Sequence, residues 1–564
     1  MSGFYLGKTA DGNRLELDSK TFLTHAAIIG MTGSGKTGLG IALLEEALLS
    51  GVSVIAIDPK GDLANMLLTF PSLSEGEFAQ WSDRPAQTAA EWKEGLAQWG
   101  LDGDRISALK QGADFKLFTP GASHGIAVNM LGSFAAPVRS VIEDGDLFNS
   151  LIVSAAENLL GLIGANSETA GKEATLLAAI IGGAWAKGEN LSLETIIRQI
   201  AAPPFDKIGV FALESFYPEA KRFELASKFN ALIASPAFAS KLSGEPLDIG
   251  SIVGGKKPCA AIFSISHLGD RERMFFVTLI LNAVLSWMRS QDGSSALRAL
   301  LYMDEIFGYF PPSANPPSKT PMMLLLKQAR AFGLGAVLST QNPVDLDYKG
   351  LSNIGAWFIG RMQSAQDCNR VSAGLIGAGG SKAQLAAEIS ALEKRRFLLK
   401  TDRLITFNTR WTLSYLKGPL SREQIRLLTG GSAFADAGAQ NDRGVVLDAG
   451  AGKKRAAIEA KYEREKKRLT EKRSRLQIKL DKEKGDVTRK TIGVVATIGS
   501  GLLSALFGSK RGAVGKIGSS VKSAADMQKE RADVSMAEEE IARVDRELQE
   551  LESKTKADLA ALEG

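Results

Sequence analysis

An apolar run, a glycine-framed lysine and an amphipathic stretch follow one another within residues 25–50. The run AAIIG has the composition of a buried strand, and the residues after GMTGSGKT have the spacing of a helix. Gly30, Gly35, Lys36 and Thr37 satisfy the pattern G-x-x-x-x-G-K-[ST] in the strand, loop and helix context that the pattern requires. The segment therefore predicts a phosphate-binding loop within an α/β fold.

The chemistry of this loop assigns roles to its residues. Glycines let successive backbone N–H groups turn toward a β-phosphate, and the start of the helix adds positive potential. We expect Lys36 to reach the β- and γ-phosphates and the Thr37 hydroxyl to ligate Mg²⁺. ATP and Mg²⁺ are thus the predicted ligand and cofactor. The predicted nucleotide contacts are Gly30, Thr32, Gly33, Ser34, Gly35, Lys36 and Thr37.

Two acidic residues follow a second apolar run, in LLYMDE. A phosphate loop needs a metal-orienting carboxylate at the end of a neighbouring strand, and Asp304 stands at that position. Glu305 is next in the chain and is predicted to polarise the attacking water as a general base. An Asp-Glu pair is common on exposed turns, but its place after a buried-type run favours the catalytic interpretation.

Gln341 and Asp58 are candidates because each ends an apolar run. Gln341 follows GAVLST and is predicted to contact the γ-phosphate or to orient the water; alternatively it begins the turn before Pro343. Asp58 ends VSVIAID and is expected to face the nucleotide, although Asp-Pro is also a common exit from a strand.

The order of apolar runs predicts a mostly parallel sheet with helices on both faces. Residues 26–130 and 251–430 are expected to form one P-loop domain of RecA type, preceded by a β-hairpin at 1–25. Strand signals give way to helical periodicity between these two parts. A helical subdomain is therefore expected at 131–250.

The C-terminal part differs in composition. Residues 431–452 have the Gly, Ala and Asp content of a linker. Residues 453–490 carry 16 Lys and Arg against 7 Asp and Glu, whereas 526–564 carry 6 against 12. Heptad-like apolar spacings occur in both arms. We expect 453–564 to form a coiled-coil hairpin with a Gly- and Ser-rich tip at 491–525.

Composition gives little direct indication of a partner. A net charge of +5 over 564 residues does not by itself imply nucleic acid, and the two cysteines and three histidines form no metal-binding pattern. The first residues lack the features of a signal peptide, so cytoplasmic residence is expected. Residues 491–508 are only weakly apolar, so no membrane contact is expected there.

Five motifs in order carry a resemblance to a known family: GMTGSGKT, IAIDPKGD, LLYMDEI, LLLKQARAFGLGAVLSTQNP and FIGRMQSAQD. With these motifs, residues 1–430 resemble the HerA/FtsK superfamily of P-loop motor ATPases, especially HerA-type bacterial ATP-binding proteins. The resemblance implies a homo-oligomer, typically a hexamer, with ATP at subunit interfaces. It also implies an arginine that acts on the neighbouring subunit's γ-phosphate, which corresponds to Arg330. Arg361 is a weaker candidate near the same interface.

The sequence departs from the family at both ends. HerA has an N-terminal β-barrel that docks the nuclease NurA, whereas about 25 residues precede the first strand here. The coiled-coil hairpin is an addition to the motor.

The leading functional hypothesis is an ATP-hydrolysing DNA translocase or helicase, with duplex DNA favoured. The alternatives are an ATP-switched scaffold that binds a protein partner through 453–564, and a membrane-associated secretion- or conjugation-type ATPase.

Overall fold

The computed structural model describes most of the first 429 residues. It also describes scattered residues between 462 and 554. The chain divides into two units, Met1–Phe434 and Ala435–Gly564. Within residues 3–429, the positions left out are 123, 130–133, 166–169, 236–237, 239–243, 313, 342–346, 348–349, 351, 363, 365–366, 370 and 373–381.

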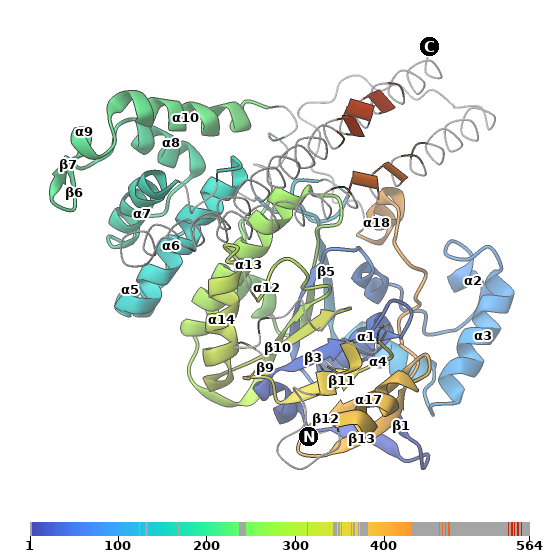
Figure 1. The fold of residues 1–564 in the computed structure, drawn as a ribbon. Helices are drawn as coiled ribbons and strands as arrows, with labels where there is room; N and C mark the ends of the chain where they lie inside the picture. The colour runs from blue at the N-terminus through green and yellow to red at the C-terminus, as the bar shows by residue number, and fades with distance from the viewer. Residues whose placement is uncertain are drawn as a thin grey trace, which may run out of the picture. The chain divides into compact units, whose positions relative to one another are not determined.

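Eleven strands of the described part of the first unit form one sheet, in the order β2-β1-β13-β12-β11-β3-β10-β9-β4-β8-β5 (Figure 1). The stretch from β11 to β5 is parallel throughout. Its strands are β11 (Ala356–Ile359), β3 (Ala26–Ile29), β10 (Phe332–Thr340), β9 (Ser294–Met303), β4 (Ser53–Asp58), β8 (Cys259–Ser264) and β5 (Asp114–Phe118). The predicted α/β fold with a mostly parallel sheet is therefore confirmed.

An antiparallel extension continues the sheet beyond β11. It contains β12 (Arg396–Lys400), β13 (Leu404–Thr409), β1 (Phe4–Thr9) and β2 (Arg14–Leu17). The N-terminal strands pair as an antiparallel hairpin, and β1 also pairs with β13, where Gly7 lies opposite Thr409. The hairpin at the start of the chain is thus an integral edge of the main sheet.

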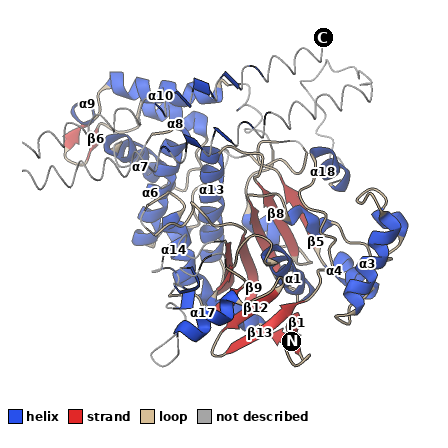
Figure 2. Cartoon of the chain, turned by 45° about the vertical axis from the view of Figure 1, so that its right-hand side comes forward, coloured by secondary structure: helices blue, strands red, loops and turns tan. Residues whose placement is uncertain are grey.

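Helices cover both faces of the sheet, and the alternation of side chains along each strand explains why (Figure 2). In β3, Ala27 and Ile29 pack into one apolar core, while Ala26 and Ile28 pack into the other. The first core includes residues of α6 (Gly145–Leu162), α7 (Gly171–Trp185), α13 (Asp270–Arg289) and α14 (Lys319–Gln328). The second includes residues of α1 (Lys36–Leu49) and α4 (Gly103–Gly112).

Helices dominate the described residues between β5 and β8. Apart from a two-stranded hairpin of β6 (Lys207–Ile208) and β7 (Phe211–Ala212), this region contributes no strand to any sheet in the described part. Its other elements are α5 (Arg139–Ile142), α8 (Leu193–Ala201), α9 (Leu213–Phe216), α10 (Glu219–Ile233) and α12 (Ile249–Val253). That residues 131–250 form a separate helical subdomain stays a prediction.

The remaining elements flank the sheet. They are η1 (Ser19–Thr24), η2 (Leu63–Leu67), α2 (Glu75–Phe78), α3 (Pro85–Ala97), η4 (Ala329–Ala331), α17 (Lys382–Ser390) and α18 (Arg422–Leu428). In the described residues, no helix is both long enough and apolar enough to cross a membrane.

In the second unit, Lys472 Nζ lies 4.0 Å from Glu547 Oε2, which brings one residue of each predicted arm together. The coiled-coil hairpin over 453–564 stays a prediction, and its tip at 491–525 and the linker at 431–452 lie outside the described residues.

Buried ion pairs, which we call the Arg410 clasp, connect the residues that follow β13 to α1. The Arg410 guanidinium is fully buried and forms ion pairs with Glu45 at 3.0 Å and Glu46 at 2.9 Å. Glu45 also accepts hydrogen bonds from the backbone N–H groups of Leu413 and Ser414. These contacts hold the phosphate-loop helix against the chain that follows β13.

Candidate nucleotide site

The phosphate loop connects β3 to α1 at the carboxyl edge of the parallel strands. Gly33 and Gly35 have φ angles of 80° and 103°, which a residue with a Cβ adopts only at a cost. A Cβ at Gly35 would also lie 3.1 Å from Arg395 Cγ. The helix begins at Lys36, and Thr37 is its second residue. The two glycines therefore let the chain turn sharply between β3 and α1 where a side chain would be strained.

Lys36 lies against its own loop. Its ammonium donates to the carbonyl oxygen of Gly30 at 2.5 Å and to that of Met31 at 3.2 Å. Burial lowers the pKa of Lys36 to about 8, and Lys60 adds to this effect, whereas Glu305 and Asp304 oppose it. The group is thus a cation at neutral pH, and an approaching phosphate would stabilise that charge further.

Asp304 and Glu305 follow β9 at the same edge of the sheet. Asp304 is 3% exposed, and burial raises the pKa of its carboxyl, although the Lys60 charge acts in the opposite direction. Glu305 has φ of 49°, a left-handed conformation that is uncommon for a side-chain-bearing residue. Such conformations are concentrated at functional sites.

The Glu305 carboxylate accepts two short hydrogen bonds on one oxygen. Lys60 Nζ and Gln341 Nε2 each lie 2.6 Å from Glu305 Oε2. Burial raises the pKa of Glu305, but these hydrogen bonds and the charges of Lys60 and Lys36 outweigh it, so the pKa is below its ordinary value. Glu305 is therefore an anion at neutral pH, as a group that accepts a proton from water must be.

A chain of side-chain hydrogen bonds connects the phosphate loop with three other loops. Thr32 Oγ1 donates to Gln341 Oε1 at 2.6 Å, Gln341 donates to Glu305, and Lys60 donates to the same carboxylate. The four residues follow β3, β10, β9 and β4, which are neighbours in the sheet. Parallel strands bring their carboxyl ends to one edge, so residues far apart in sequence meet there.

Asp58 lies at this edge but uses its carboxylate in the local turn. It accepts the backbone N–H groups of Gly61 at 2.7 Å, Leu63 at 2.9 Å and Lys60 at 3.3 Å. Burial raises the pKa of Asp58 to about 7, and the nearby Asp304 charge adds to the rise. These contacts shape the turn that carries Lys60. A direct nucleotide contact by Asp58 stays a prediction.

Lys60 and Arg395 belong to this site, although sequence reasoning missed them. The signal for Lys60 was its place directly after the strand end, in IDPKGD. Arg395 precedes β12 with φ of 66°, and its backbone N–H donates to the Ser34 carbonyl at 2.8 Å. Its guanidinium lies over the Trp411 ring at 5.4 Å. No local sequence pattern marks Arg395.

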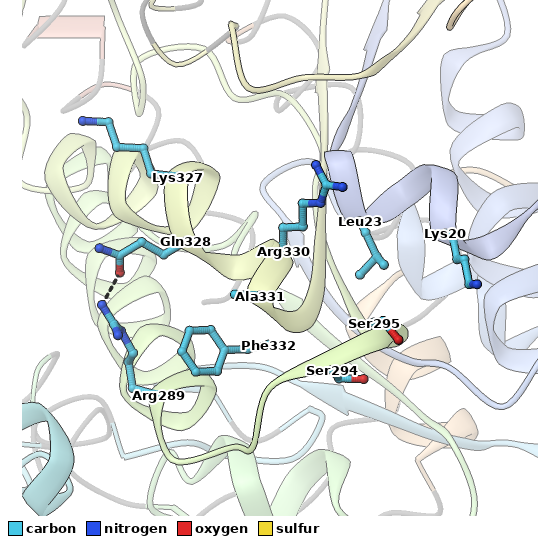
Figure 3. A pocket seen from close by; sticks show the side chains of 10 residues that line it. All are labelled: Lys20, Leu23, Arg289, Ser294, Ser295, Lys327, Gln328, Arg330, Ala331 and Phe332. Carbon is cyan, nitrogen blue, oxygen red and sulfur yellow. Dashed lines mark hydrogen bonds between the residues drawn. The ribbon is translucent and has the colours of Figure 1, made fainter.

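Arg330 lies at the opposite edge of the sheet. It belongs to η4, which directly precedes β10, whereas Gln341 follows β10. At about 3.3 Å per residue, the length of β10 separates Arg330 from Gln341 by roughly 26 Å. The exposed Arg330 side chain lines a cavity of about 890 Å³ together with Lys20, Arg289 and Lys327 (Figure 3). Arg330 is therefore placed away from the phosphate loop of its own chain.

Arg361, by contrast, lies beside its own phosphate loop. Its carbonyl oxygen accepts the Met31 N–H at 2.8 Å, directly after β11. The structure thus brings together the phosphate loop, Asp58, Asp304, Glu305, Gln341 and Arg361, and it separates Arg330 from them.

A family model matches part of the chain. Residues 4–93 match the family model described as the central domain of the helicase HerA, DUF87. This match supports the resemblance carried by the five motifs. No curated protein matches the chain.

Among solved structures, the fold is similar to VirB4 of Thermoanaerobacter pseudethanolicus, at 14% identity and a TM-score of 0.46, over 72% of this chain and 96% of that chain. Plasmid coupling protein TrwB in complex with ADP and Mg²⁺ is 14% identical, with a TM-score of 0.45, over 73% and 91% of the two chains. The genome packaging NTPase B204 from Sulfolobus turreted icosahedral virus 2 is 16% identical, with a TM-score of 0.21, over 28% and 71%.

Proposed function

We propose that this chain, which resembles the HerA/FtsK superfamily of P-loop ATPases, hydrolyses ATP at the site around Lys36 and uses the energy to move DNA. The hydrogen-bonded chain of Thr32, Gln341, Glu305 and Lys60 beside the phosphate loop supports the ATPase part. The match of residues 4–93 to the HerA central domain supports the DNA part.

In this proposal the triphosphate lies in the loop between β3 and α1, with loop N–H groups and the Lys36 ammonium on its oxygens. Lys36 would exchange its contacts with the Gly30 and Met31 carbonyls for phosphate oxygens. Thr37 and Asp304 supply a hydroxyl and a buried carboxylate, a donor set that suits Mg²⁺. Bound there, Mg²⁺ would neutralise charge that develops on the phosphates.

Glu305 is the proposed general base. A water between Glu305 and the γ-phosphorus would pass its proton to the carboxylate as its oxygen attacks phosphorus and the bond to the β-phosphate oxygen breaks. Gln341 holds the carboxylate through its amide nitrogen and the loop through its amide oxygen, which accepts from Thr32. Gln341 therefore couples the position of the base to the phosphate loop.

Arg330 cannot serve the site of its own chain over a separation of roughly 26 Å. We propose that it acts on the γ-phosphate of a neighbouring copy, which requires a homo-oligomer, a hexamer by analogy with the family. The surrounding Lys20, Arg289 and Lys327 make this face cationic, which suits an approaching triphosphate.

Mixing two inactive variants tests this arrangement. Arg330→Ala lacks the arginine but keeps Glu305, and Glu305→Gln has the opposite defect. A mixed oligomer contains interfaces at which both residues are intact, so mixing should restore part of the ATP turnover. Mixtures that stay as inactive as either variant alone would contradict action between subunits.

DNA coupling is tested by the ATPase rate of the assembled protein at low salt. Duplex DNA should raise the rate, and salt should suppress the stimulation steeply, because phosphate contacts release counterions. A rate that no duplex or single strand changes would refute the DNA part. Removal of residues 450–564 separates a motor from a scaffold. A motor should keep its ATPase and change its choice of partner, whereas loss of all function with normal nucleotide turnover would favour the scaffold.

A further inference from the structure

A second cavity lies among helices that pack on one face of the sheet. Its volume is about 430 Å³, within the range of small-molecule sites. Residues of α6, α7, α12 and α13 form much of its wall, and the segment 134–138 forms another part. None of the residues proposed for the ATPase chemistry lines this cavity, so it is a separate candidate site.

Most of the wall is apolar. Phe134, Leu151 and Leu279 are buried side chains that line it. Trp185 adds an indole ring that is fixed in place, because its Nε1 donates to the Phe134 carbonyl at 3.1 Å. Trp287 adds a second indole ring, which is half-buried and therefore keeps surface that a ligand can reach. Such a wall suits the apolar body of a compact organic molecule.

One carboxylate gives the cavity a negative charge. Among the described residues that line it, Asp248 is the only one with an ionisable side chain. The Ser251 hydroxyl donates to one carboxylate oxygen at 2.6 Å, and the Ser251 N–H donates to the other at 3.2 Å. These hydrogen bonds hold the pKa of Asp248 below its ordinary value, although partial burial acts in the opposite direction. Asp248 is therefore an anion at neutral pH.

This carboxylate is accessible and has no cation beside it. Asp248 is an exposed residue, so a ligand in the cavity can reach its oxygens. The two hydrogen bonds from Ser251 occupy about half of the roughly four acceptor positions of a carboxylate. In the part of the chain that the structure describes, no Lys, Arg or His side chain contributes to the pKa shift of Asp248. A ligand that brings a positive charge would therefore find an acceptor able to bind it.

The carboxylate and the Trp287 ring border the same gap. A Cβ at Gly250 would lie 3.3 Å from Asp248 Oδ1 and 3.4 Å from Trp287 Cδ1. Gly250 has no side chain, so the space between the charge and the indole stays open. An ammonium group that pairs with Asp248 can thus lie close to an aromatic ring, and the faces of such rings attract cations.

We propose that this cavity binds a small organic amine, whose ammonium group pairs with Asp248 and whose apolar body packs against Trp287 and Leu279. An organic cation suits the wall better than a bare metal ion, because the described lining offers one carboxylate and no second ionised ligand. The site is separate from the proposed ATPase chemistry and stands or falls independently of it.

The test compares three probes of similar size that differ in charge: 4-fluorophenethylamine, 2-(4-fluorophenyl)ethanol and 3-(4-fluorophenyl)propanoate. Fluorine NMR on the full chain should show line broadening of the amine that phenethylamine without fluorine reverses. The alcohol should bind at least about fivefold more weakly, because it carries no charge to pair with Asp248. The propanoate should bind most weakly of the three. Equal binding of the amine and the alcohol, or no binding of the amine, would overturn the proposal.

A matched pair of variants tests the role of the charge. Asp248 is the N-cap of α12, and Asp248→Asn removes its charge but keeps a residue type that caps helices well. The amine should then bind no more tightly than the alcohol. Asp102→Asn is the control, because Asp102 caps α4 in the same way, by accepting the Arg105 N–H, and lies outside the lining. It should leave the preference for the amine unchanged. A preference that survives Asp248→Asn would contradict the site.

A third variant tests the location. Gly250→Ala places a methyl group in the gap between Asp248 and Trp287, and it should weaken binding of the amine and the alcohol together. An amine that binds Gly250→Ala as tightly as the parent would contradict the placement. If Asp248→Asn does not fold, Gly250→Ala and the three probes on the parent chain decide.

Discussion

Replacing Lys60 with Met should shift the acidic limb of the ATPase pH profile upward. Lys60 Nζ lies 2.6 Å from Glu305 Oε2, and this contact lowers the pKa of the Glu305 carboxyl. Without the ammonium, the pKa of Glu305 rises, and more of the base is protonated at a given acidic pH. The rate on the acidic side therefore falls, whereas Glu305 remains ionised at neutral pH.

The size of the shift follows from the exposure of the pair. The Lys60 side chain is 40% exposed and that of Glu305 is 17% exposed, so solvent screens the attraction. Pairs of this kind contribute about 0.2–1 kcal/mol. Since one pKa unit corresponds to about 1.4 kcal/mol, the acidic limb should move up by about 0.7 unit at most.

The assay is steady-state ATP turnover of the assembled protein from acidic to alkaline pH. Lys257→Met is a matched control, because Lys257 donates to the Gln111 carbonyl and takes no part in the site. Its profile should coincide with that of the parent. An acidic limb that stays in place or moves downward in Lys60→Met would refute the electrostatic coupling between Lys60 and Glu305.

Three further predictions follow from the site and its support. Burial lowers the pKa of Lys36 to about 8. ATP affinity, measured by calorimetry, should therefore weaken as the pH rises through that value. An affinity that stays constant across this pH range would contradict the role of the ammonium. Arg410→Met leaves Glu45 buried without its cation and should cost about 3–5 kcal/mol of stability in urea unfolding, whereas a loss below 1 kcal/mol would refute the clasp. Gly35→Ala places a Cβ at φ of 103° and 3.1 Å from Arg395. Nucleotide binding should therefore be lost, while the circular dichroism spectrum should show that the fold is kept. Full binding would show that the loop tolerates a side chain.

Local patterns in the sequence were sufficient for the parallel part of the fold. The strand, loop and helix around Lys36 are short-range features, and the apolar run before Asp304 predicts a buried strand without knowledge of its neighbours. Once a parallel sheet is assumed, the carboxyl ends of its strands must share one edge. This geometric rule is why Glu305 and Gln341 could be placed near each other before the structure was known.

Such local patterns could not predict which strands pair when the strands are far apart in the chain. The sequence predicts the N-terminal hairpin as a separate segment before the P-loop domain. In the structure, β1 pairs with β13, some four hundred positions later in the chain. Nothing local distinguishes a hairpin that stands alone from one that joins a sheet edge, because the difference depends on tertiary pairing.

Lys60 and Arg395 were missed for a related reason. A lysine after a strand end usually faces solvent, and only the approach of Glu305, 245 residues away, gives Lys60 a role in the site. Asp58 left two interpretations open, and the structure adds that its carboxylate accepts three backbone N–H groups of the following turn.

The most direct test of the central claim is the rate of ATP hydrolysis by Glu305→Gln, measured together with its ATP affinity. Glutamine keeps the shape of the side chain and an oxygen that accepts from Lys60 and Gln341, but it cannot take a proton from water. Turnover should fall by about a hundredfold or more while ATP binding is retained. A Glu305→Gln protein that hydrolyses ATP as fast as the parent would contradict the assignment of Glu305 as the base.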